Sequence, residues 1–398
     1  ITILEQLENK EDRRVEFILL ALKEMHNQLE ELGSSLLILH DTPLQAFEKL
    51  LSDYTIQAVY TNHDYEPYAT KRDKSIQELL KKKSIELKTF KDQVIFEKNE
   101  VAKDDGLPYT IFTPYMRKWK TRLTDFYLKP YPAKKYFSDF LKTKPFPFPT
   151  LKKLGFQSTG LDFKVPALDK KKISVYDKQR DYPGIPGTTR LGVHLRFGTV
   201  SIRQLVTMAG ELNETWLNEL IWREFYMGIL FHFPHVATGP FKKQYAHINW
   251  RNNEEEFKAW CEGQTGYPIV DAGMRELNAT GFMHNRVRMI TASFLTKHLL
   301  IDWRWGEAYF AEKLLDYDLA ANNGGWQWAA SSGCDAVPYF RIFNPAEQTK
   351  RFDPEHTYIK KWVPEFQELT YPAPIVEHKF ARERVLAAYK KALAPYKE

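Results

Sequence analysis

Apolar residues in the first third of the chain follow two different spacings. Intervals of three and four, which are typical of amphipathic helices, occur over residues 15–32, 43–54 and 67–83. Short apolar runs, which predict buried strands, occur at 35–39, 56–61 and 85–90. Because strands and helices alternate, the pattern predicts a mostly parallel sheet with helices on its faces. The glycine pattern G-x-G-x-x-G of dinucleotide-binding sheets does not occur.

The pattern changes twice further along the chain. Residues 129–187 contain recurring prolines and scattered lysines, which predict a long connector. Helical spacing then dominates, over residues 201–212, 214–232, 254–261, 269–279, 284–300, 304–315 and 377–392. We therefore predict an α/β domain over residues 1–128, a connector over 129–187 and a large all-α domain over 188–398.

Composition narrows the class of protein. The 398 residues are 43% hydrophobic and 27% charged, which is typical of a soluble globular protein, and the longest apolar run is too short for a membrane span. Two cysteines, Cys261 and Cys334, do not make a disulfide framework and fit a reducing cytoplasm. The net charge of +6 permits a nucleic-acid partner. An aromatic content of 14%, with 10 tryptophans, indicates stacking surfaces or a planar ligand.

The segment GTTRLGVHLRFG, at 187–198, is a candidate phosphate site. Thr188 and Thr189 supply hydroxyls and backbone N–H groups, and Arg190 supplies a positive charge. A turn followed by a helix N-cap explains the same residues without a ligand. The segment by itself leaves both interpretations open.

The segment WLNELIWREFY, at 216–226, combines charged and aromatic residues on one predicted helix. Glu219 and Arg223 are four residues apart, as are Trp222 and Tyr226, so acid, base and aromatic rings can share a face. An ordinary surface ion pair beside core aromatics is the alternative.

Arginines of the segment MHNRVRM, at 283–289, point to different faces of a predicted helix. One of Arg286 and Arg288 can meet a phosphate while the other points inward to a buried carboxylate. Asp316 and Asp318 are two such carboxylates, and Arg288 is a natural candidate partner because a buried aspartate needs one. The alternative is a solvated basic patch.

The segment DLAANNGGWQWAASSG, at 318–333, places carboxylate and amide groups beside two indoles. These polar groups can bind the edge of a planar heterocycle. The pair Gly324–Gly325 weakens regular structure and predicts a tight turn beside Trp326 and Trp328. The sequence predicts no metal site, because H-E-x-x-H is absent.

Aromatic and basic residues alternate in the segment PYFRIFNPAEQTKRFD, at 338–353. Arg341, Lys350 and Arg351 can contact a nucleic-acid backbone while aromatic rings stack on bases. A charged loop is the alternative.

Together these segments resemble the photolyase/cryptochrome family, nearest to its microbial class I cyclobutane pyrimidine dimer photolyases. The resemblance runs from about residue 12 to residue 389 and is most specific over 176–346. Its motifs include GTTRLG, WLNELIWREFY, GYPIVDAGMRELNATGFMHNRVRMITASFL, DWRWGEAYF and DLAANNGGWQWAASSGCDAVPYFRIFNP. The resemblance implies an α/β amino-terminal domain with a Rossmann-like sheet and a helical domain that binds FAD.

The resemblance also implies a set of cofactor-binding residues, with the FAD folded into a U shape. Tyr176, Thr188, Thr189, Arg190 and Leu191 would hold its phosphate and ribose side. The cavity floor and the surroundings of the flavin ring would be formed by Trp216, Glu219, Arg223, Asn285, Arg288, Asp316, Asp318 and Asn322. Asn322 would lie beside the reactive flavin nitrogen.

In this family, light drives an electron from reduced anionic FAD into a pyrimidine dimer that has been flipped out of DNA. The resemblance implies lesion and DNA contacts from Trp222, Arg223, Asn285, Arg286, Met289, Trp328, Arg341 and Gln348. Glu219 would bond the bases, in its protonated form if it stabilises the radical anion. A chain of indoles, Trp326, Trp303 and then Trp250, would carry electrons to the oxidised flavin.

Two positions favour dimer repair within the family. Met289 stands where (6-4) photolyases have histidine, and Asn322 stands where plant cryptochromes have aspartate. A cryptochrome-type blue-light sensor without repair activity remains the alternative, and a helical nucleic-acid-binding protein without flavin is a third interpretation.

Several further expectations follow from the resemblance. The family pattern starts with a strand that precedes EDRRVEF, so we expect an N-terminal domain that lacks its first strand. The resemblance leaves open a second, antenna chromophore, which would be a folate, a deazaflavin or a flavin. We expect a cytoplasmic, nucleoid-associated monomer that acts on UV-damaged DNA and has no membrane partner.

Overall fold

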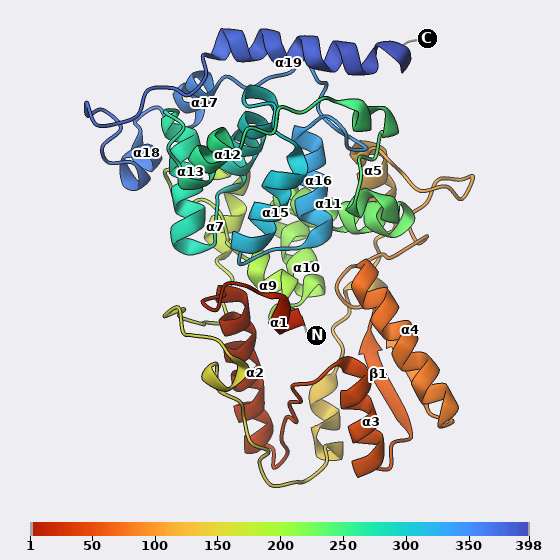
Figure 1. Cartoon of the computed structure of the whole chain (residues 1–398). Helices are drawn as coiled ribbons and strands as arrows, with labels where there is room; N and C mark the ends of the chain where they lie inside the picture. Colours follow the sequence, from red (N-terminus) through yellow and green to blue (C-terminus); the bar gives the residue numbers. More distant parts are fainter. Residues whose placement is uncertain (1–2, 397–398) are drawn as a thin grey trace. The chain divides into compact units, whose positions relative to one another are not determined.

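The computed structural model describes residues 3–396, which divide into two compact units (Figure 1). The first unit comprises the residues up to Ile95, with Thr124–Ala167 and Leu191–Thr207. The second comprises Phe96–Leu123, Leu168–Arg190 and the residues from Met208 onward.

The first unit contains a small parallel sheet flanked by helices. Strands β1 (Ala58–Asn62) and β2 (Glu86–Phe90) pair in parallel, with Ala58 opposite Glu86. Its helices are α1 (Ile3–Gln6), α2 (Arg13–Glu31), α3 (Pro43–Asp53), α4 (Pro67–Lys82), α6 (Asp125–Leu128) and α9 (Gly192–Arg196), with 3-10 turns η1 (Ala133–Asp139) and η2 (Lys152–Leu154). Local signals set the helix starts: Asp12 caps α2 and Thr42 caps α3 ahead of Pro43.

The strand predicted at 35–39 is wrong. Among the described residues, no strand is assigned to that segment. The sheet of the first unit consists of the two strands β1 and β2. The hydroxyl of Ser35 accepts a hydrogen bond from the backbone N–H of Phe146 at 2.8 Å. An apolar run supplies the side chains of a strand, but a strand also needs a neighbouring backbone to complete its ladder.

The second unit is helical. Its helices are α5 (Phe112–Arg122), α7 (Lys170–Ser174), α8 (Tyr176–Gln179), α11 (Glu214–His232), α12 (Glu254–Glu262), α13 (Pro268–Thr280), α14 (Asn285–Ser293), α15 (Trp303–Lys313), α16 (Leu319–Ala329), α17 (Pro345–Phe352), α18 (Thr357–Trp362) and α19 (His378–Leu393). The short turns η3 (Pro234–Ala237) and η4 (Lys243–His247) follow α11, and η6 (Ala394–Tyr396) follows α19. Helix α10 (Ile202–Leu212) precedes α11. The helix predicted at 284–300 is α14 followed by a π-helical turn, η5 (Phe294–His298). No described helix is long and apolar enough to cross a membrane.

Helix α16 lies at the centre of this unit. It packs against α11, α14 and α15, and Trp326 on α16 belongs to an extensive apolar core. The tight turn predicted at Gly324–Gly325 is wrong, because α16 continues through both glycines to Ala329. Helix packing explains why a residue without a side chain is needed at Gly324, as the next section describes.

Candidate active site

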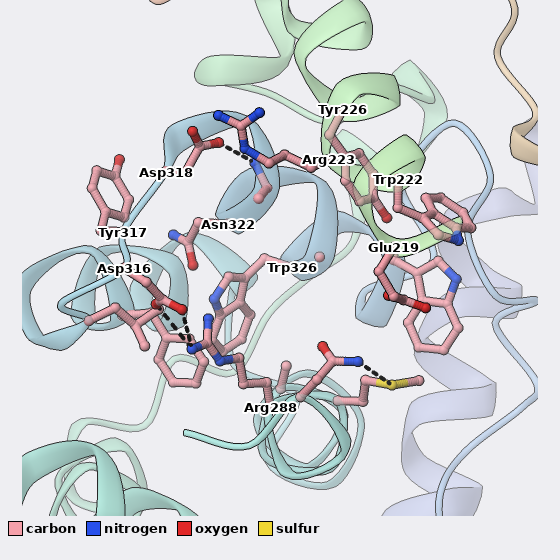
Figure 2. Close-up of a pocket in the computed structure, with 18 of the residues that line it drawn as sticks. Glu219, Trp222, Arg223, Tyr226, Arg288, Asp316, Tyr317, Asp318, Asn322 and Trp326 are labelled. Atoms are coloured by element: carbon pink, nitrogen blue, oxygen red, sulfur yellow. Dashed lines mark hydrogen bonds and ion pairs between the residues drawn. The ribbon is translucent and has the colours of Figure 1, made fainter. Parts of the chain in front are cut away.

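A cavity of about 410 Å³ opens among the central helices of the second unit (Figure 2). Its lining residues come from α11, α14, α15, α16 and the segments beside them. They are Arg180, Glu219, Trp222, Arg223, Tyr226, Asn285, Arg288, Met289, Ala292, Phe310, Leu314, Asp316, Tyr317, Asp318, Ala321, Asn322, Gly325, Trp326 and Trp328. The cavity therefore combines ionic, amide and aromatic groups, as binding sites for organic ligands commonly do.

One face of α11 forms a wall of this cavity. Asn213 caps the helix by accepting a hydrogen bond from the N–H of Trp216 at 3.1 Å. Glu219, Trp222 and Tyr226 then recur at three- and four-residue intervals and line the cavity. The Trp222 indole stacks on Phe112, with ring centroids 3.7 Å apart and planes 6° apart, so this packing fixes its orientation.

Glu219 is the carboxylate of this wall. It forms a close ion pair with Arg180, which ends α8. Burial raises the pKa of Glu219 above its usual range, while the positive charge of Arg180 opposes that rise. Glu219 is thus a carboxyl group whose protonation depends on Arg180.

An ion pair in which one guanidinium nitrogen, Nη2 of Arg288, contacts both carboxylate oxygens forms the opposite side of the cavity. Arg288 on α14 donates to both carboxylate oxygens of Asp316, at 3.0 and 2.9 Å. Its Nε donates to the carbonyl of Met283 at 2.8 Å, which holds the guanidinium plane. The prediction that Arg288 pairs with one of the two nearby aspartates is confirmed, and that aspartate is Asp316.

Two further polar residues of this side belong to the start of α16. Asp318 caps the helix by accepting a hydrogen bond from the N–H of Ala321 at 2.9 Å, and its side chain and that of Arg223 point toward one another (Figure 2). Asn322 donates from Nδ2 to the carbonyl of Glu307 at 3.1 Å. This bond holds the Asn322 amide in one orientation at the cavity wall.

Glycines on α15 and α16 allow aromatic rings to pack closely beside the cavity. A Cβ atom on Gly324 would lie 2.2 Å from the Tyr226 ring, and one on Gly306 would lie 2.1 Å from Trp326. A Cβ on Gly325 would meet nothing within 4 Å. Gly324 is therefore required by packing, whereas Gly325 faces open space in the cavity lining.

We expect Gly324→Ala and Gly325→Ala to have opposite effects on stability. Overpacking against Tyr226 should lower the free energy of unfolding of Gly324→Ala by about 1–3 kcal/mol. Gly325→Ala should raise it by about 0.5–1 kcal/mol, because alanine is the better helix former and meets no neighbour. Denaturant unfolding of the two ligand-free variants measures both values, and equal shifts would contradict the packing argument.

The predicted indole chain lies partly outside the cavity. Trp326 lines the cavity and is 2% exposed, with its ring centroid 5.0 Å from that of Phe310. Trp303, at the start of α15, is equally buried in the same core. Trp250 is half-buried and lies edge-on to Tyr389 at 6.1 Å. A further indole, Trp305, packs edge-on against Phe257, with ring centroids 5.2 Å apart.

Other predicted cofactor residues do not line this cavity. Tyr176 begins α8, Thr188 and Thr189 are half-buried, Trp216 is buried on α11, and Leu191 is buried in the first unit. Arg190 has a positive φ of 54° and lies over the Phe282 ring at 4.3 Å. Arg190 also lies 3.9 Å from the buried carboxylate of Glu276. These six residues therefore lie outside the cavity lining, and their cofactor role stays a prediction.

The residues predicted to contact DNA also divide into those that line the cavity and those that do not. Trp222, Arg223, Asn285, Met289 and Trp328 line the cavity. The remaining three lie outside its lining: Arg286 pairs with Asp181 at 2.7 Å, Arg341 is exposed in a loop and Gln348 is half-buried on α17.

Sequence reasoning missed Arg180. It lies in a segment predicted to be a connector, which contains the short helix α8. The spacing of four residues from Tyr176 to Arg180 was an available signal, and the Arg180 guanidinium lies 5.5 Å from the centre of the Tyr176 ring.

Comparison with known proteins identifies the family and the fold. Residues 216–370 match the family model described as the FAD binding domain of DNA photolyase, and residues 3–135 match the model described as DNA photolyase. The chain belongs to the DNA photolyase family. Deoxyribodipyrimidine photo-lyase of a Synechococcus strain is 38% identical over 97% of this chain and 88% of the relative. The protein of that name from Escherichia coli is 38% identical over 96% of this chain and 90% of the relative.

Solved structures of the family have the same fold. A bacterial class III photolyase from Agrobacterium tumefaciens aligns with a TM-score of 0.79 and 32% identity, over 97% of this chain and 89% of that one. An archaeal photolyase from Sulfolobus tokodaii, crystallised with two FAD molecules, aligns with a TM-score of 0.81 and 32% identity, over 98% and 90% of the two chains. A Synechocystis cryptochrome, 23% identical with a TM-score of 0.76 over 93% and 87%, shares the fold. The predicted family and fold class, an α/β domain with a helical FAD-binding domain, are confirmed.

The cavity suits the flavin of this family. It supplies the Arg288–Asp316 pair, the Asn322 amide and the caps of α16 as polar partners for a heterocycle. Among the described residues, nothing accepts a hydrogen bond from the buried Nε1 of Trp326, which a ligand could pair. Gly325 leaves space where a side chain would otherwise project. These residues fit FAD as the resident cofactor.

Proposed function

We propose that this chain is a light-driven DNA repair enzyme that splits cyclobutane pyrimidine dimers with reduced FAD. The observation that carries the proposal is a single cavity with two chemical sides. One side has the Arg288–Asp316 pair, Asp318 and Asn322, which suit a flavin. The other has the Trp222 and Trp328 rings with Glu219, Asn285 and Met289, which suit stacked pyrimidines.

In this proposal FAD, when bound and reduced, supplies one electron to the dimer under blue light and recovers it after the ring has opened. Arg288, Asp316, Asp318, Asn322 and Arg223 hold and orient the cofactor, together with Tyr176, Thr188, Thr189, Arg190, Leu191 and Trp216 outside the cavity. Trp222 and Trp328 hold the flipped lesion between aromatic surfaces and exclude water. Glu219 and Asn285 bond the polar edges of the bases.

The indoles Trp326, Trp303 and Trp250 form the proposed route for electrons from the protein exterior to the cavity. Trp326 is at the cavity wall and Trp303 lies in the same core. Trp250 is half-buried, so it is the member that solvent reductants can reach.

A binding experiment tests the proposal without relying on activity. We expect the purified chain to carry about one FAD per chain, and its flavin absorbance to shift when a dimer-containing oligonucleotide is added. An undamaged oligonucleotide of the same sequence should give no shift. If the chain binds FAD but its flavin absorbance does not change when the dimer-containing oligonucleotide is added, the proposal is contradicted and the cryptochrome-type sensory alternative is favoured.

Glu219 should give repair a pH dependence of defined sign. Its raised pKa keeps the carboxyl protonated, and able to donate to a base, at higher pH than an ordinary glutamate. We expect the repair rate to fall as the pH rises through that pKa. Arg180→Gln should move the fall to higher pH, because Arg180 opposes the rise in pKa.

The matched control is Glu219→Gln, which retains an N–H donor but does not titrate. Its rate should be independent of pH over the same range. The measurement is the pH profile of single-turnover repair, and an unchanged profile in Glu219→Gln would show that another group titrates.

We also propose that the enzyme acts as a monomer near the nucleoid in the cytoplasm. The free thiols of Cys261 and Cys334 are consistent with a reducing compartment, and the substrate is DNA. The relative from Sulfolobus tokodaii holds two FAD molecules, which is consistent with a second chromophore in this family.

A further inference from the structure

Asp181 lies between two arginines beside the cavity. Its Oδ1 accepts a hydrogen bond from Arg286 at 2.7 Å, and the same oxygen lies 3.8 Å from Nε of Arg180. Arg180 lines the cavity and also pairs with Glu219. Asp181 therefore links the two arginines through one carboxylate oxygen.

The arrangement is accessible but ordered. The Asp181 side chain is 39% exposed, whereas those of Arg180 and Arg286 are 23% and 16% exposed. The Arg286 guanidinium lies over the Phe352 ring at 4.2 Å, which fixes its plane. The arginines are thus held by packing, while the carboxylate between them is reachable from solvent.

Two guanidinium groups that converge on one oxyanion make a site that also suits a phosphate. Asp181 supplies the oxyanion in the structure, and its negative charge offsets part of the charge of both arginines. A DNA phosphate that enters this site must compete with Asp181 for the donors of Arg286.

We propose that Asp181 is an internal substitute for a DNA backbone phosphate. It keeps Arg180 and Arg286 in position in the free protein and is displaced when a phosphate beside the lesion takes its place. This inference rests on the proposed function, because the phosphate belongs to the DNA whose dimer enters the cavity.

Asp181→Asn tests this role. Asparagine has a similar shape but no charge, so it removes the competing anion. We expect dimer-containing DNA to bind about threefold to tenfold more tightly, from the loss of one exposed ion pair and of one repulsion with the phosphate. We also expect the logarithmic salt dependence of binding to become steeper by about one.

Asp177→Asn is the matched control. Asp177 lies on α8, four residues before Asp181, and its Oδ1 accepts a hydrogen bond from Asn213 at 2.8 Å. The Asp177→Asn substitution removes one negative charge from the same segment and leaves the contact between Asp181 and Arg286 unchanged. Fluorescence anisotropy at several salt concentrations, with a dimer-containing single-stranded oligonucleotide, compares wild type and both variants.

The expected result is tighter, more salt-sensitive binding in Asp181→Asn alone, and its loss when Arg286→Gln is added. Equal affinities of the two aspartate variants would overturn the inference. Weaker binding or loss of bound FAD in Asp181→Asn would also overturn it, because Asp181 would then be a structural support. If wild type fails to bind or repair dimer DNA, the proposed function fails; if wild type repairs and Asp181→Asn gains nothing, only this inference fails.

Discussion

Trp326→Phe should nearly abolish light-driven reduction of oxidised FAD while leaving repair by chemically reduced enzyme close to wild type. Phenylalanine preserves most of the packing against Phe310 but is far harder to oxidise than an indole. Among the three proposed electron carriers, Trp326 is the one that lines the cavity. The measurement is the rate of flavin bleaching under blue light with an external reductant, alongside repair after reduction with dithionite.

Trp260→Phe provides the control for this prediction. The Trp260 ring is fully buried, 6.0 Å from Trp326, and its Nε1 donates to the carbonyl of Thr291 at 3.2 Å. The proposed route passes through Trp303 instead, so Trp260→Phe should photoreduce normally. A loss of photoreduction in Trp260→Phe, with Trp303→Phe unaffected, would place the route through Trp260.

Trp328→Ala should weaken the binding of dimer-containing DNA while leaving photoreduction intact. Trp328 lines the cavity and is half-buried beside Phe343, with ring centroids 6.4 Å apart. Loss of one aromatic surface against a base costs about 1–3 kcal/mol, which corresponds to about 5- to 150-fold in affinity. Titration of the variant with dimer-containing and undamaged oligonucleotides measures the loss.

The conservative variant Trp328→Phe separates stacking from folding. It keeps a ring at the cavity wall and should recover most of the affinity that Trp328→Ala loses. If Trp326→Phe and Trp328→Ala gave the same defect, the proposed division between electron supply and lesion binding would be wrong.

Helix periodicity predicted much of the second unit because it is a local property. The segment 214–232 was predicted as a helix and is α11 with those bounds. The strand at 35–39 was wrong because a strand depends on a partner elsewhere in the chain. The turn at Gly324–Gly325 was wrong for a related reason. Glycine is needed at Gly324 because the ring of Tyr226, 98 positions earlier in the chain, packs against it.

The candidate site was predicted mainly where its residues lie in compact motifs. Glu219 with Trp222, and Asp316 with Asp318, were found from short segments and are at the cavity wall. Arg180 was missed because its partner Glu219 is 39 positions away, and the pair Asp181–Arg286 spans 105 positions. Such pairs form only when distant helices pack, so local composition does not reveal them.

The most direct test of the account is the loss of cyclobutane dimers from a defined oligonucleotide under blue light. Reduced wild-type enzyme should convert the dimer to two pyrimidines in the light, with no conversion in the dark or with flavin removed. The account would be contradicted if the reduced, flavin-bearing protein left the dimer intact in both single- and double-stranded DNA under the same light.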